Sequence, residues 1–190
     1  MALRNAFRSF CLISACSATL LAGCANNSAS NPSNYAQRSS DVEAVDATIE
    51  RQVERALDQA DARLGDARIR AHSYNGTVLL VGQVPSDELR AMAGNVTSGL
   101  RGVSQVHNEL SIAANLPTSQ RLNDTWLTTN VISHLATNEH IDSSKLKVTT
   151  ENASVYLMGM VTRQEADRIV NAASAVGGIQ RIVKVFDYID

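Results

Sequence analysis

Two stretches of the chain repeat one pattern of apolar and polar positions. Residues 75–84 have the sequence NGTVLLVGQV, and residues 152–161 have the sequence NASVYLMGMV. Each stretch begins with a turn residue and continues as a dense apolar run with a glycine near its end. A short apolar run with β-branched residues, bounded by turn signals, indicates a buried strand. The pattern therefore predicts two buried strands in equivalent places.

A hairpin turn is expected at the start of each of these strands. The Asn-Gly pair at 75–76 is the strongest short hairpin signal, because both residues tolerate positive φ. The Asn-Ala pair at 152–153 is poorer turn chemistry, so the second hairpin is predicted mainly from its match to the first. The preceding segments, 69–74 and 146–151, alternate more weakly and supply the first strand of each hairpin.

The match extends to both sides of the hairpins and defines a repeat of about seventy residues. Upstream, apolar residues recur at i, i+4 and i+8, the spacing of one helix face. Downstream, a Ser or Thr followed by acidic residues indicates a helix start, and a Gly-hydrophobic step precedes a third strand. The matching sets are Ile49, Val53 and Leu57 with Leu127, Val131 and Leu135; Ser86, Asp87 and Glu88 with Thr162 and Glu165; and Gly102 and Val103 with Gly178 and Ile179.

These elements predict an α+β fold made of two αββαβ units. Each unit is expected to hold a three-stranded mixed sheet in the order 1-2-3, with two helices on one face. The strand–helix–strand crossover should be right-handed, which makes strands two and three parallel. Gly82 and Gly159, late in the second strands, mark a bulge or a close backbone approach. Because each unit is near the lower size limit for independent stability, we expect the two to pack together.

The N-terminal segment has the pattern of a lipoprotein signal peptide at residues 1–23. Arg4 and Arg8 precede an apolar run at 10–21, which is too short to anchor the chain across a bilayer. The run ends in Leu-Ala-Gly-Cys at 21–24, a lipobox whose Cys24 thiol can carry diacylglycerol. An ordinary cleaved signal peptide with an incidental cysteine is the alternative. The resemblance to bacterial lipoprotein precursors implies three acyl chains at Cys24, which is enough for stable anchoring.

The rest of the chain is divided by composition and by the repeat. Ala25 stands where an aspartate would often retain a lipoprotein in the inner membrane, so the lipoprotein family rule implies the outer membrane, on its periplasmic face. Residues 24–40, rich in Asn, Ser and Ala, are predicted to be a lipidated flexible tether. The two units are expected at 41–113 and 123–190, with a linker at 114–122.

Cysteine usage and charge exclude several classes of function. Cys11 and Cys16 lie in the segment expected to be removed, so the folded part has no thiol for catalysis, disulfides or metal binding. The chain has 17 Lys and Arg and 19 Asp and Glu residues, for a formal net charge of −2. Removal of Arg4 and Arg8 would make that charge −4. The sequence therefore argues against broad electrostatic capture of nucleic acid.

The repeated pattern resembles the BON domain family. The resemblance rests on a glycine late in each second strand and a Gly-hydrophobic step before each third strand, twice in register; these glycines are Gly82, Gly102, Gly159 and Gly178. Segments 123–129 (NDTWLTT) and 147–152 (KVTTEN) extend it to lipoproteins with two such units. The resemblance implies a non-enzymatic protein that supports envelope integrity, including at division sites. It also implies that the first helix of the second unit binds anionic phospholipid.

That helix carries the only tryptophan of the chain, Trp126. Asp124 or Thr125 can cap the helix, and Leu127 begins the stripe that should face the sheet. Trp126 lies one residue off this stripe, on a polar face. The residue pattern leaves two explanations open, packing of the indole between the domains or its insertion among lipid headgroups, and the resemblance favours the second. The residues expected to contact lipid are Asn123, Asp124, Thr125, Trp126, Leu127, Thr129, Asn130 and Ser133.

The corresponding helix of the first unit has a different charge pattern. Thr48 stands at the position of Trp126 and is flanked by Asp46, Glu50 and Glu54. With Asp41 and Glu43 these acids form a cluster, which at this spacing is interpreted as a solvated helix face. An anionic membrane would repel such a face, so the two units should differ in function.

The second unit's helix also departs from the pattern of its relatives. Asn130 and Ile132 stand where close relatives tend to have basic residues, each of which would contribute about 1 kcal/mol near an anionic surface. Arg121, Lys145 and Lys147 are the candidates to supply that charge instead.

Motifs for chemistry are absent from the sequence. The histidines His72, His107, His134 and His140 are scattered, and no metalloprotease, P-loop or nucleophile-elbow motif occurs. We therefore expect no catalytic residue, metal or cofactor. The protein is also expected to be a monomer. The alternative function is that of a periplasmic adaptor for outer-membrane assembly proteins or for activators of peptidoglycan amidases.

Overall fold

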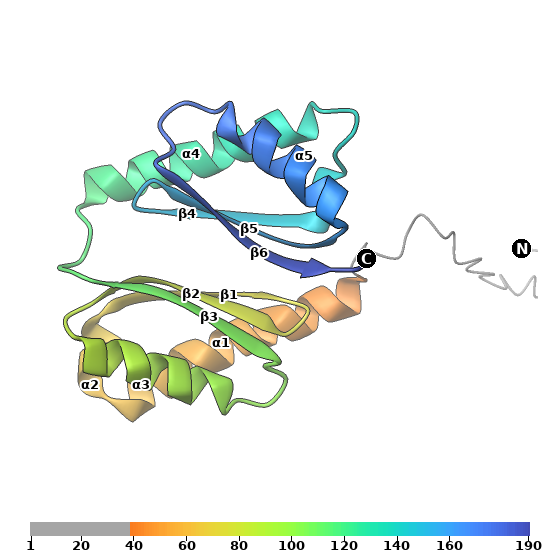
Figure 1. Ribbon diagram of the computed structural model, residues 1–190. Helices are drawn as coiled ribbons and strands as arrows, with labels where there is room; N and C mark the ends of the chain where they lie inside the picture. Colours follow the sequence, from red (N-terminus) through yellow and green to blue (C-terminus); the bar gives the residue numbers. More distant parts are fainter. Residues whose placement is uncertain (1–38) are drawn as a thin grey trace, which may run out of the picture. The chain divides into compact units, whose positions relative to one another are not determined.

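The computed structural model describes residues 39–190, which lie within one compact unit, Pro32–Asp190. The predicted signal peptide, the lipobox with Cys24 and nearly all of the predicted tether lie outside the described residues. The described part contains two domains with the same order of elements (Figure 1).

The first domain has three helices and three strands. In chain order they are α1 (Ser40–Ala60), α2 (Ala62–Asp66), β1 (Arg68–Tyr74), β2 (Thr77–Val84), α3 (Asp87–Ser98) and β3 (Gln105–Ile112). The second domain repeats the order with a 3-10 turn, η2, in place of α2. Its elements are α4 (Thr118–Ala136), η2 (Ser143–Lys145), β4 (Leu146–Glu151), β5 (Ser154–Val161), α5 (Arg163–Ser174) and β6 (Arg181–Tyr188).

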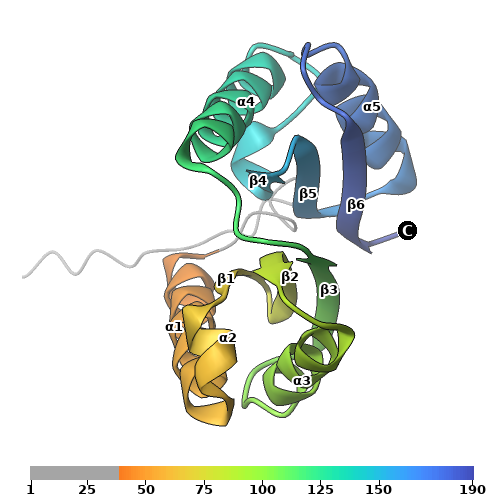
Figure 2. The ribbon, with the colours of Figure 1, turned by 90° about the vertical axis from the view of Figure 1, so that its left-hand side faces the viewer.

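Each domain holds one three-stranded mixed sheet, in the orders β1-β2-β3 and β4-β5-β6. The hairpin strands pair antiparallel, and the third strand runs parallel to the second. The two long helices of each domain cover the same face of its sheet (Figure 2). The predicted α+β fold, strand order and parallel pairing are therefore confirmed.

Local signals in the sequence explain where the α3 and α5 helices begin. The Ser86 hydroxyl accepts a hydrogen bond from the Leu89 N–H at the start of α3. Thr162 and Glu165 form a reciprocal capping box at the start of α5. The second hairpin also forms, although Asn152 and Ala153 must both adopt positive φ, at 49° and 55°.

The glycines singled out by the repeat lie where a side chain would collide. Gly82 has φ +127°, and a Cβ there would lie 1.9 Å from the Arg68 carbonyl oxygen, so β1 and β2 approach closely at this point. A Cβ on Gly159 would lie 2.9 Å from the Lys145 carbonyl oxygen. Gly102 and Gly178 both have positive φ before the third strands and contact the first helices of their domains.

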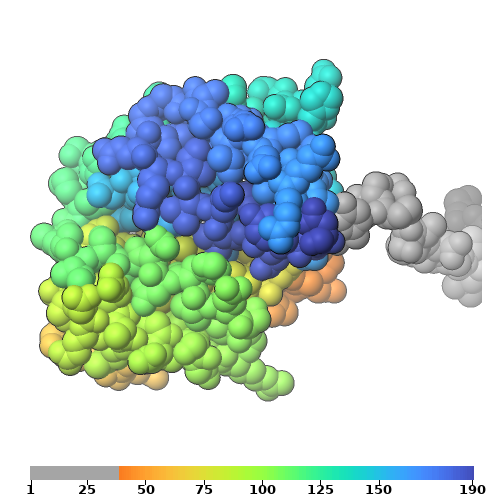
Figure 3. All heavy atoms as spheres, in the orientation of Figure 1, coloured from red at the N-terminus to blue at the C-terminus, as the bar shows by residue number. Residues whose placement is uncertain are grey.

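The two sheets pack against each other through the faces that the helices leave open. Each domain has its own core between helices and sheet. A third apolar cluster joins the domains and consists of Tyr74, Leu79, Val81, Tyr156, Met158 and Val185. On the face shown in Figure 3 the domains meet along a continuous boundary. Because both faces of β2 are covered, all of its residues are buried.

Candidate functional site

Helix α4 begins earlier than its sequence suggests. Pro117 stands at the N-cap with φ −64°, a value that suits entry into a helix, and no side chain in the described range caps the helix start. The prediction that Asp124 or Thr125 caps this helix is wrong, because both lie inside it. Residues 118–122, assigned to the linker from the sequence, form its beginning.

The inner face of α4 is fixed by a regular apolar stripe. Leu127, Val131 and Leu135 are fully buried at i, i+4 and i+8, as the repeat predicted. Leu127 also contacts the loop before β6, since its Cδ2 atom would lie 3.2 Å from a Cβ on Gly178. This stripe sets the rotation of α4 about its axis and therefore decides which residues point outward.

The outer face of α4 carries large apolar side chains in contact with solvent. Leu122 is 66% exposed and Trp126 is 57% exposed. Residues four apart in a helix are neighbours on its surface, so these two form one apolar patch. Ile132, on the same helix, is 44% exposed. Leu122 was not predicted as a site residue because the sequence analysis assigned it to the linker. Its position four residues before Trp126 would have indicated that both side chains lie on one helix face.

The exposure of Trp126 bears on one of the two explanations left open by the sequence, its packing between the domains. The space between the domains is filled by the cluster around Tyr74 and Tyr156, to which Trp126 does not belong. The interpretation of Trp126 as an interdomain staple is therefore wrong. The indole lies outside the buried stripe of α4, as the sequence predicted.

The remaining predicted lipid contacts divide into two groups. Asp124 and Leu127 are 3% and 0% exposed, so these two cannot reach a surface and their assignment as contacts is wrong. Asn130 is half-buried. The exposed members of the set are Asn123, Thr125, Trp126, Thr129 and Ser133.

Asp124 connects α4 to the second hairpin. Its carboxylate accepts hydrogen bonds from the N–H groups of Asn152 and Ala153, both at 2.9 Å, and from the Gln120 amide. In the first domain, the buried Asp46 accepts bonds from the N–H groups of Asn75 and Gly76. Asp46 is therefore not part of a solvated acidic face, which corrects that interpretation.

The two lysines considered as sources of positive charge for α4 form ion pairs with other residues. Lys147 forms an ion pair with Glu50 of the first domain, and Lys145 pairs with Asp142. Glu50 also accepts a hydrogen bond from the Ser73 N–H, so it too is removed from the predicted acidic face. Of the three candidates, only Arg121 remains exposed, on α4 itself.

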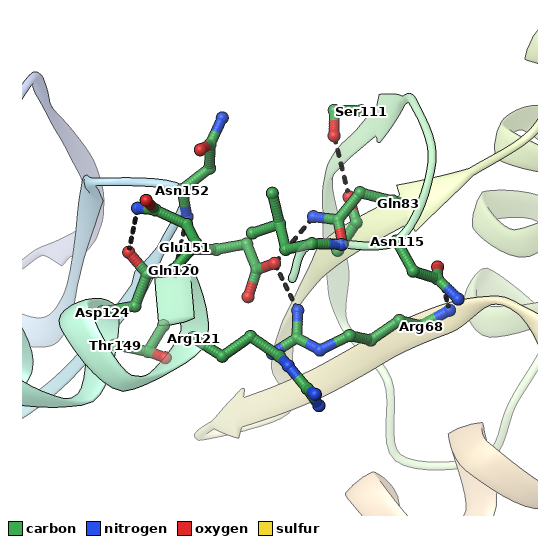
Figure 4. A network of polar contacts seen from close by, with 12 residues as sticks. Arg68, Gln83, Ser111, Asn115, Gln120, Arg121, Asp124, Thr149, Glu151 and Asn152 are labelled. Carbon is green, nitrogen blue, oxygen red and sulfur yellow. Dashed lines mark hydrogen bonds and ion pairs between the residues drawn. The ribbon is translucent and has the colours of Figure 1, made fainter. Parts of the chain in front are cut away.

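A buried carboxylate next to the second hairpin joins the two domains (Figure 4). Glu151, 5% exposed, accepts bonds from Arg68 at 2.5 Å and from the Gln83 amide at 2.7 Å. The Gln83 carbonyl accepts the N–H of Leu116 in the linker. The start of α4 is thus held to the first domain through both the hairpin and the linker.

His72 lies between the sheets, with its Nε2 atom 3.3 Å from the Thr149 hydroxyl. Burial, aided by the charges of Lys147 and Arg70, lowers the pKa of His72 to about 4. The imidazole is therefore neutral at pH 7, as expected for a packed histidine.

Within residues 39–190, no group of three or more His, Cys, Asp or Glu side chains is placed to hold a metal ion. No helix of that range is long and apolar enough to cross a bilayer.

Comparison with known proteins identifies the family. The sequence model of the BON domain family matches the chain twice, at residues 45–114 and 123–190. This chain belongs to the BON domain family. Its two BON domains are the two domains of the fold described above.

The relatives include proteins of similar length. The Outer membrane lipoprotein DolP of Haemophilus influenzae is 37% identical over 145 residues, which are 76% of this chain and 75% of that protein. The 21 kDa hemolysin of Actinobacillus pleuropneumoniae is 34% identical over 153 residues, 80% of this chain and 78% of its own length. Among solved structures, the C-terminal domain of CdsD from Chlamydia trachomatis matches with a TM-score of 0.30 at 15% identity, covering 76% of this chain and 67% of that one.

Proposed function

We propose that this chain is an outer-membrane lipoprotein whose second BON domain binds anionic phospholipid through the outer face of α4. The observation that carries the proposal is the exposed pair Leu122 and Trp126. Apolar side chains of this kind, tryptophan above all, are favoured at a membrane–water interface.

The charge of α4 supports an anionic surface as the target. Asp124 is the only acidic residue of the helix, and it is buried. The exposed ionisable residues of α4 are Arg121 and His134. The helix therefore presents no carboxylate that would be repelled by an anionic membrane.

The anchoring half of the proposal rests on the sequence and on a relative. The lipobox ends at Cys24, and a 37% identical protein bears the name Outer membrane lipoprotein DolP. Acyl chains at Cys24 would hold the protein on the periplasmic face, since two or more chains give stable anchoring. The protein would act there without catalysis, in support of envelope integrity and at sites of division.

A vesicle titration tests the lipid-binding half. The non-acylated chain 25–190 keeps every described helix and strand. It should bind phosphatidylcholine vesicles containing phosphatidylglycerol, and Trp126→Ala or Trp126→Glu should weaken that binding. Burying a large apolar side chain contributes about 2 kcal/mol, so the loss should be about thirtyfold.

Matched variants distinguish binding through this face from nonspecific hydrophobic binding. Leu122→Ala should also weaken binding. Val45→Ala, which removes a 58% exposed side chain from α1, should not. Undiminished binding by both Trp126 variants would overturn the assignment to α4.

A second candidate function is that of a protein-interaction adaptor, with envelope-assembly or division proteins as partners. It is favoured by Val42 and Val45, exposed on α1 at 36% and 58%, beside a surface hollow of about 490 Å³. A photo-crosslinker at Val45 should then capture a specific envelope protein in cells, whereas one at the exposed Arg55 should not. Equal capture from both positions would count against the adaptor.

A further inference from the structure

Positive charge gathers where the two domains meet beside the start of α4. Strand β1 presents Arg68 and Arg70, and α4 presents Arg121. The chain as a whole is acidic, with a formal net charge of −2. The junction is thus a local excess of cations in an acidic protein.

Two carboxylates of this region are already bonded inside the protein. Glu151 accepts bonds from Arg68 and Gln83, and Asp124 holds the turn of the second hairpin. Each is buried or half-buried. Their negative charge is therefore compensated by these partners and is not exposed to solvent.

Two of the arginines retain capacity to bind an anion. Arg70 and Arg121 are exposed, and neither forms an ion pair with any residue of the described range. Arg121 Nη2 donates to the Thr118 hydroxyl at 2.7 Å, which leaves other N–H groups of its guanidinium available. Arg68, 18% exposed, meets Glu151 through Nη1.

In the view of Figure 4 the side chains of Arg121 and Arg68 overlap near the Glu151 carboxylate. The two arginines come from different domains, one from α4 and one from β1. Guanidinium groups bind the oxygens of a phosphate with paired N–H donors. Such a pair therefore matches the chemistry of a phosphate group.

We propose that Arg121 and Arg68, with Arg70 at the solvent edge, bind the phosphate of an anionic lipid headgroup at the domain junction. The first domain then adds positive charge beside the membrane-facing side of α4. This inference rests on the proposed function, because Leu122 and Trp126 on the neighbouring turns of α4 bring the bilayer to the site.

The test compares affinities for two kinds of vesicle. The non-acylated chain is titrated with phosphatidylcholine vesicles and with vesicles that also contain phosphatidylglycerol. Arg121→Gln should lower the preference for phosphatidylglycerol about fivefold, the effect of one basic residue near an anionic surface. Binding to pure phosphatidylcholine should not change. Arg121→Lys, which keeps the charge but loses the planar fork, should retain part of the preference.

A matched control removes the same charge elsewhere. Arg101 is exposed in the loop before β3. That loop contacts the hairpin turn through the bond from the Ser104 N–H to the Gly76 carbonyl, whereas Arg68 lies at the opposite end of β1. Arg101→Gln should therefore leave the preference intact. An equal loss in both variants, or no loss in Arg121→Gln, would overturn the inference.

A second measurement identifies the source of the phosphate. The Nε–H signals of Arg68 and Arg121 are followed by NMR during addition of phosphatidylglycerol vesicles or of inorganic phosphate. Changes with the lipid that inorganic phosphate does not reproduce support the headgroup. Equal changes with inorganic phosphate contradict it.

The two proposals fail in different ways. Loss of the phosphatidylglycerol preference alone is the signature of the arginine site. Trp126→Ala should instead weaken binding to both kinds of vesicle. A protein whose binding survives Trp126→Ala but not Arg121→Gln would refute the proposed function of α4 while retaining the anion site.

Discussion

Asp46 and Asp124 occupy equivalent positions in the two domains and perform the same structural task. Each is buried on the first helix of its domain, and each accepts hydrogen bonds from two consecutive N–H groups in the turn of the hairpin. The carboxylate ties the helix to the hairpin from the inside. In the second domain it links α4 to the turn that directly follows Glu151.

Replacing Asp124 should therefore destabilise the second domain. Asp124→Ala leaves the turn N–H groups of Asn152 and Ala153 without their acceptor, at a cost of about 3 kcal/mol in the free energy of unfolding. Urea titration followed by circular dichroism measures the loss. The control is Glu54→Ala, which removes an exposed acid from α1. A cost below about 1 kcal/mol for Asp124→Ala would contradict the structural role.

The two strand glycines should differ in their tolerance of alanine. At Gly82 a Cβ would collide with the backbone of Arg68 at an unfavourable φ, whereas at Gly159 the nearest atoms stand at 2.9 Å. We expect Gly82→Ala to destabilise by about 3 kcal/mol or more, and Gly159→Ala by less. Gly177→Ala, with no atom within 4 Å of the new Cβ, should be nearly neutral in thermal unfolding. The reverse order would show that β1 and β2 do not approach as described.

Removal of the Glu151 carboxylate should loosen the contact between the domains. Glu151→Ala leaves the Arg68 guanidinium without its carboxylate in a largely buried place, which costs about 3 kcal/mol. Hydrogen exchange should rise in β2 and β5, whose shared faces form the junction. Exchange confined to residues around the substitution would argue against a coupled interface.

Stability should fall on acidification because of His72. Its pKa is lowered from 6.5 to about 4 in the folded state, first by burial and then by Lys147 and Arg70. The unfolded chain therefore binds the proton more readily, so this contribution is complete above pH 6.5 and is lost as the pH falls toward 4. The loss should be roughly 3 kcal/mol.

The control for that pH dependence is a pair of histidine variants. His72→Gln should remove the difference in stability between pH 7 and pH 4.5 that belongs to His72, whereas the exposed His134→Gln should not. Burial raises the pKa of Asp187, so its contribution to stability changes with pH in the opposite direction. Asp187 is present in the wild type and in both variants, so it does not alter the comparison. Equal pH profiles for the wild type and His72→Gln would contradict the account.

Much of the fold could be predicted because its signals are local. The Asn-Gly turn at 75–76, the cap residues Ser86 and Thr162, and the buried stripe of Leu127, Val131 and Leu135 each act within a few residues. The second hairpin has weaker turn residues, and it was predicted from its match to the first. The parallel third strand followed from the helix that connects the second and third strands as a crossover.

The errors concern groups whose partners are distant in the sequence. Asp46 and Glu50 have the helical spacing of solvated acids, and Asp124 stands where a cap was expected. Only the fold brings these three carboxylates to turn N–H groups or to Lys147. Lys147 and Glu50 are separated by 97 positions, so no local pattern reports their ion pair. The early start of α4 was missed because Pro117 provides no capping side chain.

The fluorescence of Trp126 tests the central claim most directly, because it is the only tryptophan of the chain. Titration of the non-acylated protein with phosphatidylglycerol-containing vesicles should shift the emission to shorter wavelength. Lipids with brominated acyl chains should then quench it, since the exposed indole would move from water into the interface. Emission that stays unchanged and unquenched while the protein sediments with the vesicles would show that α4 is not the membrane-binding face.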